Sequence, residues 1–300
     1  MRVIVLHDNP EWFEPIRTAF SRHGVDVEEW VSDETAVDIT KPPPADAVYY
    51  NRCSSSAHTR GRHRSLDQAM TILRWLHQHG RVVVNGLIAA QLENSKALQY
   101  MTTVQYGIGV PRSLLTAKPT LEVIEGEFGK STPFLVKPDR GGRGTYIRYY
   151  GDADAFQADP QPLESITGLY VVQQFVKVEC QRYLYTSLAL PESGGCFDPN
   201  MCPCELPKSR FRILTDFSHP ILDKLDRLFK GTGLENGAVE FIMDEEGVPR
   251  VIDINTNTAY NRDAEVGAGV EEGWESVTRY VINRLRQAEA SVPNGDSVAV

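Results

Sequence analysis

Four short segments carry residues that could bind a nucleotide together with a metal ion. Two of them contain the lysines Lys96 and Lys137, the third is the glycine-rich stretch Gly141-Gly142-Arg143-Gly144, and the fourth ends in Asp253 and Asn255. Lysine ammonium groups and the backbone amides of a glycine-rich loop bind phosphate oxygens, whereas carboxylate and amide oxygens bind Mg²⁺. The order of the four segments is more informative than any one of them, and it indicates a site for Mg-ATP.

The phosphate-binding residues have ordinary explanations when each is taken alone. Lys137 follows the apolar residues 134–136 at the end of a strand, where a lysine often just extends to solvent. The stretch 141–144 lies between two strands and could be a flexible hairpin, and it lacks the Gly-Lys-Ser/Thr of a Walker-type loop. A partly buried lysine needs an anion, however, and glycines let backbone amides approach phosphate closely. The two segments together therefore favour phosphate binding.

Three oxygen-bearing side chains are expected on one face of a hairpin. Asp253 and Asn255 are two residues apart, so they share a face of one strand. Glu240 lies on the strand before it, across the turn 244–247. The neighbouring residues are apolar, which argues against a merely solvated polar face, because charged groups in an apolar sheet need a partner. The three residues predict a site for a hard cation such as Mg²⁺.

The apolar segment 171–176 is a further strand that contains Gln173, Gln174 and Val176. The edge of such a strand could offer backbone hydrogen bonds to adenine, with the side chain of Gln174 adding another. On the residues alone, a strand of the core is the better explanation. Only the neighbouring segments favour adenine binding.

The elements before these segments alternate between strands and helices over residues 1–92, which predicts a parallel sheet in a small Rossmann-like lobe. No Gly-x-Gly-x-x-Gly turn follows the first strand, so a dinucleotide site is not expected. The ends of the strands carry His7-Asp8, Asn51-Arg52 and Asn85-Gly86. Arg52 could bind a carboxylate, although an exposed arginine-rich loop explains it about as well.

Composition excludes some classes of function. The net charge of −9 and the pI near 5.3 argue against a nucleic-acid-binding surface. The sequence has no apolar run of about 18 residues and no export signal, so a membrane span is not expected and a cytoplasmic protein is. The five cysteines are then reduced thiols. An incidental cluster is favoured over a zinc site at Cys196, Cys202 and Cys204.

Together the segments from Val84 to Val270 resemble the ATP-grasp superfamily and, within it, the RimK-type carboxylate–amine ligases, which include α-L-glutamate ligases. The resemblance implies an α/β protein in which two α+β subdomains clamp ATP, preceded by a Rossmann-like pre-ATP-grasp lobe. The implied boundaries are 1–92 for that lobe, 93–178 for the first part of the ATP-grasp fold with its lid, 179–288 for the second part, and 289–300 for a disordered tail.

The resemblance also implies roles for individual residues. These are phosphate contacts for Lys96 and Lys137, a mobile lid for Gly141, Gly142 and Gly144, an adenine hinge for Gln173, Gln174 and Val176, a Mg²⁺ site (or Mn²⁺) for Glu240, Asp253 and Asn255, and stabilisation of the transferred phosphoryl group for Arg182 and Arg212. The sequence departs from the family at Gln174, where an acidic residue is usual, and at Asp253, where Glu is usual. It departs again at 256–261, which suggests a specialised acceptor.

The implied reaction joins a small carboxylate and an amine, such as amino acids, at the expense of ATP and through an acyl phosphate. A homodimer is the default assembly. Two alternatives stay open. One is a phosphotransferase on the same fold, which would stop after phosphoryl transfer. The other is a nucleotide-binding regulatory protein, against which the presence of both lysines and the metal set argues.

Overall fold

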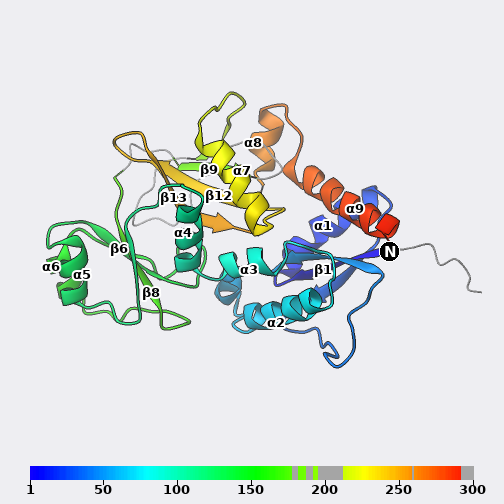
Figure 1. The fold of residues 1–300 in the computed structure, drawn as a ribbon, viewed down its shortest axis with the longest axis horizontal. Coiled ribbons are helices and arrows are strands. Elements are labelled where there is room, and N and C mark those ends of the chain that lie inside the picture. The colour runs from blue at the N-terminus through cyan, green and yellow to red at the C-terminus, as the bar shows by residue number, and fades with distance from the viewer. Residues whose placement is uncertain (178–181, 187–191, 195–211, 259, 292–300) are drawn as a thin grey trace, which may run out of the picture.

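The computed structural model describes residues 1–177, 182–186, 192–194, 212–258 and 260–291. These residues form three sheets, which lie along the long axis of an elongated molecule (Figure 1). The first sheet is at one end, the second is at the other, and the third lies with helices between and above them. Among the described helices none is both long and apolar enough to cross a membrane.

The first sheet has four parallel strands in the order β2-β1-β3-β4, as the alternation of strands and helices predicts. The two central strands, β1 and β3, are almost wholly buried because helices pack on both faces of the sheet, whereas the edge strand β2 is mostly half-buried. The register places His7 opposite Arg52, so the polar ends of two strands meet at one edge. The elements are β1 (Arg2–His7), α1 (Pro10–Arg22), β2 (Val27–Val31), β3 (Ala47–Arg52), a 3₁₀ helix (Ser55–Arg60), α2 (Ser65–Gln78) and β4 (Val83–Val84).

The second sheet is antiparallel, in the order β5-β8-β6-β7, and carries α5 and α6 on one side (Figure 1). The strand that follows the glycine-rich stretch begins only at Arg148. The reason is local, since Arg143, Gly144 and Tyr146 all have positive φ and form turns. The elements are β5 (Ser113–Thr116), α5 (Leu121–Phe128), β6 (Phe134–Pro138), β7 (Arg148–Tyr150), α6 (Ala153–Ala158) and β8 (Tyr170–Gln174).

The third sheet is antiparallel, in the order β11-β10-β9-β12-β13, with α7 packed against it. The residues 244–247 form the turn between β12 and β13, as predicted. Buried Leu225, Leu228, Val239 and Ile254 belong to the core that joins this helix to the sheet. The elements are β9 (Arg182–Thr186), β10 (Glu192–Gly194), β11 (Arg212–Ile213), α7 (Ile221–Thr232), β12 (Ala238–Met243) and β13 (Pro249–Asn255).

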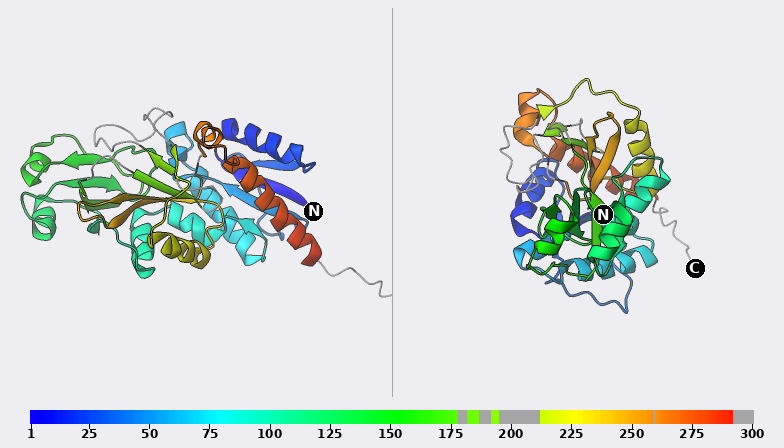
Figure 2. Two further views of the ribbon diagram at one scale, coloured as in Figure 1. Left: turned by 90° about the horizontal axis from the view of Figure 1, so that it is seen from above. Right: turned by 90° about the vertical axis from the view of Figure 1, so that its left-hand side faces the viewer.

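Four more helices connect the sheets. The consecutive helices α3 (Leu87–Glu93) and α4 (Lys96–Gln105) lead from the first sheet to the others, and both contact β13. After α8 (Arg262–Gly267), α9 (Gly273–Ser291) returns and packs on the first sheet (Figures 1 and 2). The helix extends past the predicted start of the tail, and residues 292–300 lie outside the described residues. The predicted domain boundaries remain a prediction.

Candidate active site

The three residues predicted to bind a metal lie on β12 and β13. Glu240 is directly opposite Asp253 in the register, and Asn255 Nδ2 donates to Glu240 Oε1 at 3.3 Å. A register shift follows Glu240, so Ile252 is an extra residue in β13 next to Asp253; such irregularities re-aim side chains. All three side chains are half-buried. The described residues hold no group of three His, Cys, Asp or Glu side chains placed for a metal. Glu240, Asp253 and Asn255 provide two carboxylates and one amide.

Lys96 lies within reach of this set, although 157 residues separate it from Asp253. It is the first residue of α4, where Ser95 is the N-cap and accepts a hydrogen bond from Leu98 N. Its Nζ forms an ion pair with Asp253 Oδ1. Burial disfavours the charged lysine, but the nearby carboxylate outweighs burial and raises the pKa of Lys96 above its usual range. The side chain is therefore a cation at neutral pH.

Lys137 is on β6 of the second sheet and is 6 % exposed. Its Nζ donates to Gln173 Oε1 at 2.6 Å and to Tyr100 Oη at 3.2 Å. Tyr100 Oη in turn donates to the Ile252 carbonyl at 2.9 Å. No described carboxylate forms an ion pair with Lys137, so its charge is balanced only by neutral acceptors. Such a buried ammonium group is suited to an anionic ligand.

Tyr100 joins the second and third sheets, and its role was not predicted from the sequence. It lies one helical turn after Lys96, so both residues project from the same face of α4. That spacing is the signal that could have indicated it. The structure thus brings the two lysines, Tyr100 and the Glu240, Asp253 and Asn255 set into one connected site.

The glycine-rich segment lies against the 3₁₀ helix of the first sheet. Gly142 is so close to Ser56 that a Cβ atom on the glycine would be 2.7 Å from the serine Cβ. The carbonyl of Gly141 accepts a hydrogen bond from Ser55 Oγ at 3.0 Å. Gly144 has a φ of 69°, which a glycine adopts at no steric cost. Close packing and backbone conformation together explain why this segment contains glycines.

The segment predicted to bind adenine divides between two environments. Gln173 is buried, with Nε2 donating to Ser113 Oγ at 2.9 Å and Oε1 accepting from Lys137. Gln174 is exposed, and its backbone N donates to the Arg112 carbonyl at 2.8 Å. A cavity of about 480 Å³ runs beside residues 174–177 and is lined as well by 110–112, 244–246 and Arg250. Neither Lys96 nor Lys137 lines this cavity.

The two predicted arginines are not brought into the connected site by any described contact. Arg182 begins β9 opposite Ile242, and its side chain lies outside what the structure describes. Arg212 begins β11 and is exposed. The cysteine cluster at Cys196, Cys202 and Cys204 lies outside the described residues.

Glu93 is a second residue whose position the sequence did not reveal. Its side chain is 6 % exposed and accepts four hydrogen bonds. Ser55 donates its backbone N and Oγ at 3.1 Å each, and Thr256 donates its backbone N at 2.7 Å and Oγ1 at 3.2 Å. Burial raises the pKa of Glu93, against the effect of the backbone donors. The carboxylate therefore ties the first sheet to the residue that follows Asn255.

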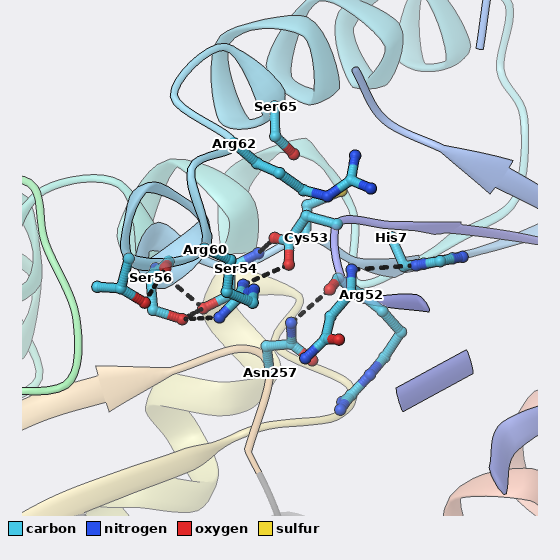
Figure 3. A network of polar contacts seen from close by, with 12 residues as sticks. His7, Arg52, Cys53, Ser54, Ser56, Arg60, Arg62, Ser65 and Asn257 are labelled. Atoms are coloured by element: carbon cyan, nitrogen blue, oxygen red, sulfur yellow. Dashed lines mark hydrogen bonds and ion pairs between the residues drawn. The ribbon is translucent and has the colours of Figure 1, made fainter. Parts of the chain in front are cut away.

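A polar network adjoins this contact at the edge of the first sheet (Figure 3). Asp8, fully buried, accepts from Ser54 N at 2.5 Å and forms an ion pair with Arg60 at 2.5 Å. Asn257 donates from Nδ2 to the carbonyl of Arg52, as the dashed line in Figure 3 marks. The loop after β13 is thus held next to the first sheet at two neighbouring residues, Thr256 through Glu93 and Asn257 through Arg52.

The sequence matches no protein-family model and no curated protein. The structure, however, is similar to that of the RimK-domain ATP-grasp protein from Sphaerobacter thermophilus, with a TM-score of 0.65 and 19% identity over 94% of this chain and 100% of that chain. It is similar to the ATP-grasp ligase PsnB complexed with minimal precursor, with a TM-score of 0.66 and 18% identity over 95% of this chain and 99% of that one.

A third similar structure is the macrocyclase MdnC from Microcystis aeruginosa, bound with the precursor peptide MdnA. Its TM-score is 0.66 at 14% identity, over 95% of this chain and 100% of that chain. Because the sequence identities are low, similarity over nearly the whole of each chain shows a shared fold and no more. The chain therefore has the ATP-grasp fold, as its resemblance to that superfamily predicts.

Proposed function

We propose that this protein is an ATP-dependent carboxylate–amine ligase that forms an amide bond through an acyl phosphate. The observation that carries the proposal is one connected site, in which half-buried Lys96 and buried Lys137 are joined to the Glu240, Asp253 and Asn255 set by contacts between four separate elements. Lys96 comes from α4, Lys137 from β6 and the others from β12 and β13. The ATP-grasp fold supports it, and one similar structure is PsnB with its minimal precursor, Mg and ADP.

The residues present fit Mg-ATP. Lys137 is a buried cation with only neutral acceptors, which a phosphate would complement. Lys96 and Asp253 form an ion pair with each other in the structure. When Mg-ATP binds, Lys96 would contact a phosphate and Asp253 would bind the metal. Glu240, Asp253 and Asn255 would hold Mg²⁺, which supplies charge neutralisation at the phosphates when bound.

In the proposed reaction an oxygen of the substrate carboxylate attacks the γ-phosphorus of ATP. The bond to the bridging oxygen breaks, ADP leaves, and an acyl phosphate forms. The nitrogen of the amine then attacks the acyl carbon, inorganic phosphate leaves with the electron pair, and the amine loses a proton to solvent. Lys96 and Lys137 would stabilise negative charge on the phosphates and orient them, with Arg182 and Arg212 proposed to assist near the transferred group.

The test is ADP release by the purified protein with Mg-ATP and a matrix of amino acids and small carboxylates. Asp253→Ala removes a proposed metal ligand, whereas Asp26→Ala removes an exposed carboxylate of the first sheet region and is the matched control. We expect release that needs one carboxylate and one amine, that persists in the control and that disappears in Asp253→Ala.

The other outcomes separate the alternatives. ADP release with a phosphorylated product and no amide would replace the ligase with a phosphotransferase. ATP binding without release under every combination of substrates would favour a nucleotide-binding regulatory protein. Release that is unchanged in Asp253→Ala would contradict the proposed metal site.

A further inference from the structure

Arg52 is a buried cation that has no anionic partner among the described residues. It is the last residue of β3 and is 2 % exposed. Two of its guanidinium nitrogens, Nε and Nη1, have no hydrogen-bond partner among the residues that the structure describes. The third, Nη2, lies 3.5 Å from the Thr258 carbonyl, the upper limit for a hydrogen bond. A buried charge with unpaired donors is costly, and it is kept where a ligand completes the pairing.

The groups around Arg52 leave its charge uncompensated. Its guanidinium lies over the Trp274 ring, 4.8 Å from the ring centroid, and 5.7 Å from that of Tyr50. Aromatic faces attract a cation but accept none of its N–H bonds in the plane of the guanidinium. The hydroxyl of Tyr50 also contacts the guanidinium, but it is neutral and does not balance the charge. The buried carboxylate of Asp8 is already paired with Arg60. Among the described residues no carboxylate forms an ion pair with Arg52.

Asn257 adds an unpaired acceptor beside this unpaired donor. Its Nδ2 donates to the carbonyl of Arg52, while its buried Oδ1 has no partner in the described part of the chain. Figure 3 shows the two residues side by side, with the Arg52 side chain extending away from Arg62 and Ser65. Asn257 follows the proposed metal ligand Asn255 by two residues, so it lies on the loop that leaves the proposed reaction centre and brings Arg52 at the end of β3 next to that loop.

We propose that Arg52 and Asn257 bind the amine substrate, and that this substrate is an α-amino acid. Its carboxylate would take the unpaired donors of Arg52, and its N–H would donate to Asn257 Oδ1. Trp274 and Tyr50 would form the apolar walls around the two contacts. This inference rests on the proposed function, because it identifies the amine of that reaction. Inorganic phosphate is the competing anion, because its P–OH could also donate to Asn257 Oδ1, and the titration below distinguishes the two ligands.

The site is closed in the structure, so a ligand enters only if residues 256–258 or Trp274 move. Binding should therefore change the fluorescence of Trp274. The test is a fluorescence and calorimetric titration of the full-length protein with each of the twenty L-amino acids, their carboxamides, and inorganic phosphate. Trp274→Phe identifies the part of the signal that comes from this ring.

We expect at least one amino acid to bind, with its carboxamide and phosphate about tenfold or more weaker, as the loss of a charged hydrogen bond predicts. Arg52→Met should lose that binding and should not lower the melting temperature of the free protein, because it removes a buried unpaired charge. Arg52→Lys, which keeps the charge, should fold and bind about tenfold more weakly. Arg286→Met, at an exposed position of α9, should bind like the wild type.

Several results would overturn the inference. Equal affinities for the amino acid and its carboxamide would show that Arg52 does not bind the carboxylate. A lower melting temperature in Arg52→Met, with amino-acid binding kept in Arg52→Lys at wild-type affinity, would make Arg52 structural. If phosphate alone bound, the site would take inorganic anions instead.

The titration also separates this inference from the proposed function. Amino-acid binding that depends on Arg52, without any ADP release, would leave the site in place and remove the ligase. In the opposite outcome, ADP release is supported by an amine that has no carboxylate group of its own and is unchanged in Arg52→Met. That result would support the ligase and contradict the proposed amino-acid site at Arg52.

Discussion

Replacing Glu93 with glutamine should destabilise the protein although it preserves the shape of the side chain. Each carboxylate oxygen accepts one backbone N–H and one hydroxyl, from Ser55 on one side and from Thr256 on the other. The glutamine oxygen can keep one of these pairs. Its NH₂ group then faces the other pair, where the hydroxyl can rotate to accept but the backbone N–H is left unpaired and buried.

The magnitude follows from these losses. A buried N–H without an acceptor costs about 1–3 kcal/mol, and replacing charged by neutral hydrogen bonds costs about 1 kcal/mol more. Glu93→Gln should therefore lower the free energy of unfolding by about 2–4 kcal/mol. In a chain of this length that corresponds to a melting temperature lower by roughly 3–6 °C. Because the lost contacts join the first sheet to residue 256, hydrogen exchange should increase at both places.

The assay is thermal and urea unfolding of Glu93→Gln beside Glu164→Gln, which removes an exposed carboxylate and should stay within about 0.5 kcal/mol of the wild type. A stability equal to or above that of the wild type would refute the reasoning. It would mean that the cost of burying the Glu93 carboxylate outweighs the four hydrogen bonds that it accepts.

Three further changes test other parts of the structure. Gly142→Ala places a Cβ 2.7 Å from that of Ser56, so residues 139–147 should lift off and be cleaved faster in limited proteolysis; an unchanged rate would contradict the observed packing. Gly126→Ala, in α5 with no atom within 4 Å of the new Cβ, should stabilise by about 0.5–1 kcal/mol in urea unfolding, and no gain would argue against a helical Gly126. Burial raises the pKa of Tyr49 to about 12, so the stability that this residue contributes is complete below its ordinary pKa of 10.0 and is lost as the pH rises through 12. Tyr49→Phe should lose less stability over that range, and an equal loss in both proteins would show that Tyr49 is not responsible.

Local patterns in the sequence determined much of the fold and several members of the candidate site. The apolar runs and their turns predict the parallel first sheet and the hairpin at 244–247, because strand periodicity and turn chemistry depend on neighbouring residues. The two-residue spacing of Asp253 and Asn255 likewise places both on one face of a strand. Ser95 before Lys96 marks the start of α4 for the same reason, since a cap acts within one turn.

Tertiary structure alone decided which of these residues meet and which buried groups lack a partner. The ion pair between Lys96 and Asp253 and the four bonds of Glu93 join elements that are far apart in the chain, and no local pattern encodes such pairs. Arg52 was predicted about equally as a carboxylate ligand or as an exposed loop residue. Its burial against Trp274 comes from the packing of α9 on the first sheet, and burial depends on the packing of the whole chain.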